Sequence, residues 1–431
     1  MQRAIYWTLG LFMICGWAGR TLADEFHGIN AGAPIWDGVI QFTKEKAAAI
    51  AATGCRAVRI NFRLDGHGSW DADLLSQYDT VIQHARNNHL VVLGLICNEA
   101  RPVGQAHYND DPHGDGLNAY VHDFAATALL LVDRYKSDIK RWEIWNEPGA
   151  WTNPNWANDP RNAGGTYILP AVYANLLAET YKQLNHYNGR TILTTHGIKL
   201  VSGGLFAHDI GGSFSTGMDY MLRVYDQTAV WDALEAATGR RYPWDYFGYH
   251  FYLNAGEPVS TQEIGDYLND VRTGQAARGD HSPLLITEFG WTTAGPSESL
   301  QRDNMRETYT FLESRPFIAG TYWYQWQDES PTVKYGLLRA DGTLKPAYDE
   351  FVLRNMTSPR RIPGDMDQDG DVDQVDFGLF QACFSGFAYP QNDPACANAK
   401  LDGDHDVDAD DLKIFRRCMS GANVPADPDC A

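Results

Sequence analysis

The stretch RWEIWNEPG, residues 141–149, passes from apolar and aromatic residues to Asn146, Glu147 and Pro148. Its first part is typical of a buried β-strand. Proline cannot donate to a strand ladder, so we expect the strand to end at this point. A carboxylate therefore stands where a buried strand ends, and the segments on either side indicate what kind of sheet the strand belongs to.

The same order, a short β-rich run followed by an amphipathic stretch of helical period, occurs eight times between residues 26 and 355. The predicted strands are 26–31, 57–63, 91–97, 141–147, 199–205, 246–252, 283–289 and 318–326. The predicted helices are 41–53, 72–88, 118–136, 170–187, 216–237, 261–277, 298–314 and 346–355. Eight such units predict a (β/α)8 barrel with loop insertions.

Two alternatives to this assignment remain open. Residues 190–197 compete with residues 199–205 for the place of the fifth strand. A doubly wound open sheet is the alternative fold, although no glycine-rich phosphate turn follows the first predicted strand.

A second carboxylate, Glu288, ends the seventh predicted strand, in the run PLLITEF. In a barrel the functional residues gather at the carboxyl ends of the strands, and strands four and seven face each other across the mouth. Glu147 and Glu288 would then face one cleft. Two such carboxylates suit cleavage of a glycosidic bond, in which one protonates the leaving oxygen and the other attacks or stabilises the anomeric carbon.

The motifs EIWNEP on the fourth strand and ITEFGW on the seventh resemble the two signatures of retaining glycoside hydrolases of clan A, (β/α)8 enzymes that include families 5 and 39. The resemblance extends over about residues 26–355. It implies that Glu147 is the general acid/base, that Glu288 is the nucleophile and that Asn146 binds the sugar 2-hydroxyl. This chemistry requires no metal or other cofactor.

The resemblance to family 5 also implies contacts around the bound sugar. Arg59, on the second strand, would hold the nucleophile ionised, and His250 and Tyr252 match a His-x-Tyr pattern on the sixth strand. A tryptophan at the end of the eighth strand would form the floor of the sugar site, and we prefer Trp326 to Trp323 because it lies nearer the loop.

Structural roles compete with these assignments. Arg59 could be a buried strut paired with Glu143. His250 and Tyr252 could be satisfied core residues. Asp65 and Glu99 also end strands, and each could be a third site carboxylate or a capping group in a loop.

The chain divides into four segments. Residues 1–23 have a basic start, an apolar stretch and small residues before a cleavage point, which predicts a secretory signal peptide rather than a retained anchor. The catalytic barrel is expected at 24–356, a linker at 357–363 and a repeat pair at 364–431. We therefore expect a secreted protein with no membrane association once the signal has been removed.

The repeat pair at residues 364–431 is strongly acidic. It contains fifteen Asp against four Lys and Arg, within a chain of net charge −20, which disfavours nucleic acid and anionic membranes as partners. The first repeat places aspartates at positions 1, 3, 5, 7, 9 and 12 of a calcium loop, with Gly370 at position 6. These aspartates are Asp365, Asp367, Asp369, Asp371, Asp373 and Asp376. A structural Ca²⁺ is expected there.

The second repeat follows the first at a shift of 35 residues and departs from the loop pattern. Asp402, Asp404 and Asp411 keep positions 3, 5 and 12, but Lys400 takes position 1 and His405 takes position 6, which disfavours a second tight calcium site. The paired repeat resembles a type I dockerin. This resemblance implies a cohesin-type scaffold partner, and a calcium-stiffened appendage without a partner is the alternative.

The cysteines also differ between the barrel and the C-terminal repeat pair. Local disulfides Cys383–Cys396 and Cys418–Cys430 would stabilise a module too small to hold itself together by core burial. This cysteine pattern is not part of the usual dockerin. Cys55 and Cys97 lie near the start of one predicted strand and the end of the next, and are expected to be buried free thiols.

Taken together, these features predict a secreted retaining glycoside hydrolase that acts on a β-linked polysaccharide or oligosaccharide, in the manner of cellulases, mannanases or xylanases. Two other classes remain. One is a carbohydrate-binding barrel without catalysis, which would not need both glutamates. The other is a calcium-dependent scaffold or adhesion component that acts through its C-terminal module.

Overall fold

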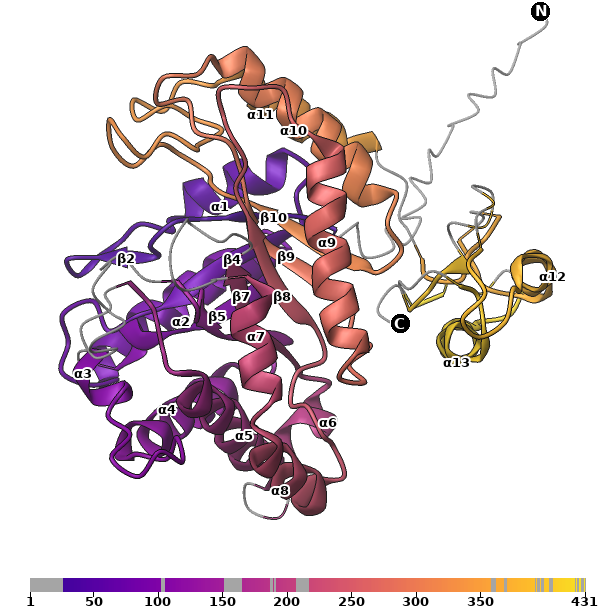
Figure 1. The fold of residues 1–431 in the computed structure, drawn as a ribbon. Helices are drawn as coiled ribbons and strands as arrows, with labels where there is room; N and C mark the ends of the chain where they lie inside the picture. Colours follow the sequence, from indigo (N-terminus) through magenta and orange to yellow (C-terminus); the bar gives the residue numbers. More distant parts are fainter. Residues whose placement is uncertain are drawn as a thin grey trace, which may run out of the picture.

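The computed structural model describes most of the chain after residue 25 (Figure 1). The described residues are 26–101, 105–150, 165–186, 189, 191–206, 217–357, 362–367, 370–391, 393, 396, 399–402, 406–422, 424, 426, 427 and 430. The predicted signal peptide, residues 358–361 of the predicted linker, Asp369 and Asp404 lie outside them. Within the described part, no helix combines the length and apolar character needed to cross a membrane.

Eight parallel strands close into a barrel in the order β1-β10-β9-β8-β7-β6-β5-β4. They are β1 (His27–Asn30), β4 (Ala57–Phe62), β5 (Val91–Ile96), β6 (Arg141–Asn146), β7 (Lys199–Phe206), β8 (Phe247–Phe251), β9 (Leu284–Phe289) and β10 (Ile318–Trp323). β1 pairs with both β4 and β10, so no edge is left open. The predicted barrel is confirmed, and the competing segment 190–197 contains a short helix, α6 (Ile192–His196).

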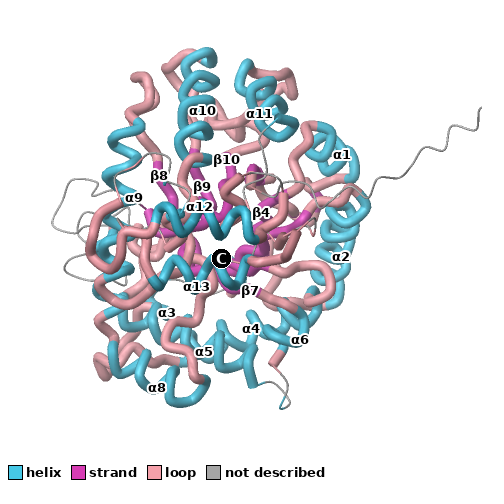
Figure 2. The backbone as a smooth tube through the Cα atoms, turned by 90° about the vertical axis from the view of Figure 1, so that its right-hand side faces the viewer, coloured by secondary structure: helices cyan, strands magenta, loops and turns pink. Residues whose placement is uncertain are grey.

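Helices surround the barrel (Figure 2). Those that follow the predicted stretches are α1 (Lys44–Ala52), α2 (Ala72–Asn87), α4 (Ala119–Tyr135), α5 (Pro170–His186), α7 (Met218–Tyr225), α8 (Thr228–Thr238), α9 (Thr261–Ala276), α10 (Glu298–Glu313) and α11 (Pro346–Thr357). Polar N-caps begin several of them: the side chains of Asp71, Asn118 and Ser297 each accept a backbone N–H from the first turn.

The predicted helix 216–237 is two helices, α7 and α8, rather than one. Trp231 Nε1 donates a hydrogen bond of 3.0 Å to the Val224 carbonyl, near the end of α7. The same carbonyl accepts the Gln227 amide at 3.1 Å, so α7 closes in a turn before α8 begins at Thr228. The continuous helical period of the sequence does not show this break.

The sequence analysis did not predict a short hairpin after β1, made of β2 (Ile35–Trp36) and β3 (Val39–Ile40). Asp37 and Gly38 form its turn with φ of 50° and 74°, a backbone that Asp-Gly favours in tight hairpins. The carboxylate of Asp65 accepts both turn amides, at 3.2 and 2.8 Å. Asp65 therefore fixes the hairpin at the carboxyl end of the barrel. Short helices η1 (Asn98–Ala100) and α3 (Gln105–Tyr108) were also not predicted.

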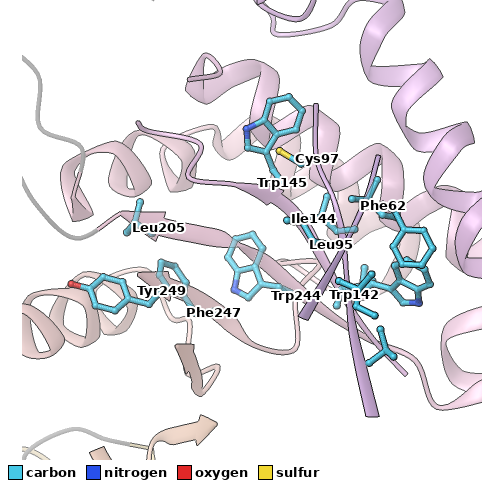
Figure 3. Close-up of a cluster of buried hydrophobic side chains, with 14 of the residues drawn as sticks. Phe62, Leu95, Cys97, Trp142, Ile144, Trp145, Leu205, Trp244, Phe247 and Tyr249 are labelled. Carbon is cyan, nitrogen blue, oxygen red and sulfur yellow. The ribbon is translucent and has the colours of Figure 1, made fainter. Parts of the chain in front are cut away.

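Large aromatic side chains fill the space between barrel and helices (Figure 3). Trp142 on β6 packs against Phe62 on β4 with ring centroids 5.0 Å apart. Between them on β5 lies Gly94, where a Cβ atom would come within 2.6 Å of the Trp142 ring. Close packing at this point therefore requires glycine.

The C-terminal part has its own apolar cluster, which includes Val372, Phe380, Val407 and Phe415. It contains α12 (Gln374–Cys383) and α13 (Ala409–Cys418). The disulfides Cys383–Cys396 and Cys418–Cys430 are confirmed, as are the buried free thiols Cys55 and Cys97. This module lies at the end of the barrel opposite the β2–β3 hairpin (Figures 1 and 2).

Candidate active site

Glu147 directly follows β6 in an unusual backbone conformation. Its φ is 44° and that of Trp145 is 80°, both in the left-handed region that costs on the order of 1–3 kcal/mol for residues other than glycine. Surrounding contacts hold this turn: the Glu147 amide donates to the Gly204 carbonyl at 3.1 Å, and buried Trp145 donates through Nε1 to the Thr166 carbonyl at 2.8 Å. The local fold thus gives Glu147 a fixed direction.

Glu288 approaches Glu147 from the facing strand, β9. One carboxylate oxygen of each glutamate and one ring nitrogen of His250 all lie within 4.8 Å of one another. The two carboxylates predicted from distant parts of the sequence are therefore brought together at the carboxyl ends of β6 and β9, with His250 of β8 between them.

Arg59 of β4 is buried beside Glu288. Its Nη1 donates to Glu288 Oε1 and its Nε donates to Glu143 Oε2, each at 2.5 Å. Nη2 donates to Asn146 Oδ1 at 2.7 Å, and Nη1 also reaches Asn30 Oδ1 at 3.0 Å. Arg59 thus pairs with Glu143, as expected if it has a structural role, and also with Glu288, as expected if it holds the nucleophile ionised.

Glu288 is surrounded by groups that favour its charged form. Burial raises the pKa of its carboxyl, but the electrostatic effects of His250 and Arg59 and the 2.7 Å hydrogen bond from Tyr252 outweigh burial and hold the pKa below its usual value. Burial, together with the charges of Glu288 and Glu147, raises the pKa of Tyr252. Tyr252 therefore stays a hydrogen-bond donor to Glu288.

His250 is fully buried. It contacts the Glu147 carboxylate directly and reaches the Glu143 carboxylate through the hydroxyl of Thr287. Its Nδ1 lies 3.0 Å from Glu147 Oε1, and its Nε2 lies 2.9 Å from Thr287 Oγ1. Thr287 Oγ1 in turn donates to Glu143 Oε1 at 2.8 Å. A Cβ atom at Gly204 would lie 2.0 Å from Nε2, so the imidazole packs directly on the backbone of β7.

Asn146 presents its amide hydrogens to the site. Because its Oδ1 accepts from Arg59, its NH₂ group is left to donate, and the residue lines the cavity beside Glu288. A donor at this position matches the sugar-hydroxyl contact that the family resemblance implies for Asn146.

A cavity of about 920 Å³ extends from Glu288 toward the β2–β3 hairpin. Several lining residues were not predicted from the sequence, among them Trp36, Lys46, Arg63 and Tyr324. Trp36 is 52% exposed, and the Arg63 guanidinium lies 5.0 Å from the centre of its ring. Burial lowers the pKa of Lys46 to about 8, partly opposed by the charge of Glu329.

Glu99, the possible third carboxylate, also lines this cavity. It accepts a hydrogen bond from Asn61 and lies 3.7 Å from Arg63. The sequence signal that could have revealed the Trp36 side of the cavity was the Asp-Gly turn, which places an aromatic residue in a tight hairpin after the first strand.

Trp326 does not form the floor of this cavity. Its side chain is 4% exposed and packs edge-on against Tyr348 of α11, with ring centroids 6.2 Å apart. The Trp326 amide donates to the Asn30 carbonyl at 3.0 Å, which draws the chain over β1 and turns the indole toward the helix layer. Tyr324 lines the cavity at the end of β10 instead, while Trp323 stacks on Trp291 in the core.

The C-terminal module brings together carboxylates of both repeats. In the first repeat, two triads have oxygens within 4.8 Å of one another: Asp365, Asp367 and Asp376, and Asp371, Asp373 and Asp376. In the second repeat the triads are Asp402, Asp408 and Asp410, and Asp406, Asp408 and Asp411. Burial and the nearby charge of Asp402 raise the pKa of Asp411 to about 7. Asp402 and Asp411 were predicted for this cluster, whereas Asp406, Asp408 and Asp410 were not.

Comparison with known proteins finds similar barrels among solved structures and a matching sequence family. No curated protein matches the sequence. A family 39 glycoside hydrolase from the gut symbiont Bacteroides cellulosilyticus WH2 is similar in structure, at 16% identity and a TM-score of 0.52, over 78% of this chain and 64% of that one. A cellulase in complex with an inhibitor has 15% identity and a TM-score of 0.52, over 77% of this chain and 92% of that one.

An exo-β-1,4-mannosidase from Opitutaceae bacterium strain TAV5 has 14% identity and a TM-score of 0.51, over 80% of this chain and 60% of that one. The chain thus spans less than two thirds of the length of two of these three structures. At such identities the likeness shows a shared barrel fold. In sequence, residues 21–329 match the profile of Cellulase (glycosyl hydrolase family 5). Because this match extends over more than half of the chain and includes both Glu147 and Glu288, the chain belongs to glycosyl hydrolase family 5.

Proposed function

We propose that the protein is a retaining glycosidase that hydrolyses β-linked polysaccharide or oligosaccharide with Glu147 and Glu288. The observation that carries the proposal is that one oxygen of each carboxylate lies within 4.8 Å of the other, beside a cavity that Glu288 lines. Retaining enzymes hold the two carboxyl groups about 5–5.5 Å apart, whereas inverting enzymes need about 6.5–9.5 Å to admit a water molecule. The spacing supports direct attack by one carboxylate.

In this mechanism Glu147 protonates the leaving oxygen while Glu288 attacks the anomeric carbon, which gives a glycosyl-enzyme. Glu147, now deprotonated, takes a proton from water, and the resulting hydroxide equivalent releases the sugar from Glu288. Arg59 and Tyr252 keep Glu288 charged for the attack. The Asn146 amide donates to the sugar 2-hydroxyl.

The direct test is a panel of cellulose, mannan and xylan oligosaccharides incubated with the full-length protein. Products are sized by chromatography, and the anomer first released is identified by proton NMR. We expect products that retain the β-configuration. First-formed α-anomers would refute the retaining mechanism, and no release from any member of the panel would refute the proposed substrate class.

The Trp36 side of the cavity supports binding of a chain rather than a single sugar. Replacing Trp36 by alanine is expected to raise KM for cellohexaose about tenfold and to leave kcat nearly unchanged, because an aromatic face contributes about 1–2 kcal/mol to stacking. Steady-state kinetics on cellohexaose and cellobiose measure this effect, with the shorter sugar least affected. Tyr389→Ala, an exposed aromatic in the C-terminal module, is the control. Equal loss on both sugars would contradict the stacking role.

For the rest of the chain we propose export through the signal peptide at residues 1–23, with the protein acting outside the cell. The two disulfides of the C-terminal module support an oxidising compartment. We further propose that the first acidic loop binds a structural Ca²⁺ and that the module docks to a cohesin-type scaffold. The converging carboxylates of the first repeat support the ion, since Ca²⁺ prefers several oxygen ligands.

Calcium is expected to stabilise the full-length protein. At a concentration 100 times the dissociation constant, binding adds about 2.7 kcal/mol to the stability of the module. Differential scanning calorimetry should therefore show a transition that moves to higher temperature with added Ca²⁺. In Asp365→Ala this shift should vanish, while the exposed Asp393→Ala keeps it. If added Ca²⁺ still raises the transition temperature of Asp365→Ala, the first loop is not the calcium site.

A further inference from the structure

Lys46 lies in the first turn of α1 and lines the same cavity as Glu288. The other two cations that line this cavity are held by carboxylates, Arg59 by Glu288 and Arg63 by Glu99. Within the described part of the chain, the Lys46 ammonium makes no ion pair and donates no hydrogen bond. Lys46 thus brings to the cavity a positive charge that no carboxylate contacts.

The surroundings of Lys46 disfavour an ammonium ion without a counter-ion. Burial lowers its pKa to about 8, and the charge of Glu329 opposes this effect only in part. Glu329 is exposed, while the neighbouring acid, Asp328, is buried and accepts a hydrogen bond from Lys345 at 2.7 Å. An anion that enters this side of the cavity would therefore compete for Lys46 with one carboxylate, that of Glu329.

Gln325 supplies a second donor beside Lys46. Its side chain is 1% exposed and lines the cavity, and its amide nitrogen Nε2 finds no acceptor among the described residues. Gln325 Oε1 and Lys46 Nζ lie 4.0 and 3.9 Å from the point that a Cβ atom at Gly32 would occupy. Because glycine has no side chain, the two polar groups share an open space in the loop after β1. Buried donors in proteins are almost always paired, so this space calls for an acceptor.

We propose that Lys46 and Gln325 form a subsite for a negatively charged group on the bound sugar chain, either the carboxylate of a uronic acid or a sulfate ester. The inference rests on the proposed function and narrows its substrate class to acidic β-linked glycans. A charged oxygen accepts from both donors and also balances the ammonium charge that burial disfavours. A neutral sugar hydroxyl accepts a hydrogen bond but leaves that charge unbalanced.

Isothermal titration calorimetry tests the charge preference without hydrolysis. The full-length protein carries Glu288→Gln throughout, so that no sugar is cleaved. The ligands are cellohexaose and its derivatives with one C6 carboxylate or one 6-sulfate, with the positional isomers separated and titrated one by one. We expect at least one charged isomer to bind roughly tenfold more tightly than cellohexaose, as is typical of a hydrogen bond to a charged group. The tighter of the carboxylate and sulfate series identifies the anion.

Three substitutions, each added to Glu288→Gln, assign the preference to this subsite. Lys46→Met keeps the length of the side chain and should abolish the advantage of the charged isomer over cellohexaose. Glu329→Gln removes the competing carboxylate and should increase that advantage. Lys44→Met is the matched control, because Lys44 carries the same charge on the same helix but is exposed, and it should leave the advantage unchanged. Equal binding of charged and neutral sugars before these substitutions, or an advantage that survives Lys46→Met, would overturn the proposal.

Proton uptake gives a second readout that depends on Lys46 alone. At pH 8 its amine carries the charge about half of the time, so an anion that binds there should draw in about half a proton per complex. Titrations in two buffers of different ionisation enthalpy measure this uptake, which should be absent with cellohexaose and in Lys46→Met. Uptake that persists in Lys46→Met would also overturn the proposal. The expected binding pattern in a protein that hydrolyses no glycan would instead refute the proposed function alone.

Discussion

Replacing Glu288 by alanine is expected to lower kcat by roughly 10⁴–10⁶-fold, the loss typical of removing a covalent nucleophile. Glu147 cannot take its place, because Glu147 is needed for proton transfer and its oxygen is hydrogen-bonded to His250. Stability should fall far less than activity, since alanine also relieves the crowding of carboxylates around His250. Hydrolysis of 2,4-dinitrophenyl β-cellobioside measures the loss.

Added azide provides the decisive control for Glu288→Ala. A small anion can enter the space left by the carboxylate and attack the anomeric carbon, and the product is then an α-glycosyl azide. Glu257→Ala, an exposed glutamate after β8, should retain full activity. A β-glycosyl azide from Glu288→Ala, or hydrolysis at the wild-type rate, would show that Glu288 is not the nucleophile.

Replacing Arg59 by methionine is expected to have the largest combined effect on stability and activity. It leaves Glu143, which is fully buried, without its cationic partner, and removal of one member of a buried pair costs about 3–5 kcal/mol. Urea denaturation measures this loss. Arg134→Met, which breaks an exposed pair with Asp79, should cost less than about 1 kcal/mol.

The same substitution should shift the pH dependence in a defined direction. In the wild type the pKa of Glu288 lies below its usual value of 4.5, so its charge stabilises the fold above the unfolded-state pKa, and this contribution disappears as pH falls through the lowered pKa. Without Arg59 that pKa rises. The acid limb of the kcat/KM profile should therefore move to higher pH in Arg59→Met, and an unmoved limb would show that Arg59 does not control Glu288.

The barrel could be predicted because the pattern that indicates it is local in the sequence. Eight apolar runs, each followed by a helical period, are visible without knowing which segments touch, and the strand-end carboxylates Glu147 and Glu288 follow from the same pattern. The break between α7 and α8 could not be predicted in this way, because the helical period of the sequence runs on through it, while the backbone turns at Gln227 and Trp231 packs back on the end of α7.

The rest of the site depends on which way side chains turn after the strands end. Trp326 and Tyr324 are equally aromatic in the sequence, and only the crossing of the chain over β1 buries the first and leaves the second at the cavity. Thr287 is a polar residue within an apolar strand. Its partners, Glu143 and His250, lie 144 and 37 residues away, so the sequence alone does not reveal that the three side chains meet.

The left-handed backbone at Trp145 and Glu147 limits how this protein could be engineered for heat tolerance. Glycine at position 145 would adopt that conformation without strain. It would also delete a fully buried indole, a loss of about 3–5 kcal/mol that exceeds the strain relieved, and it would free the turn that aims the carboxylate. Designers seeking a hardier variant should leave this turn intact and strengthen the protein elsewhere.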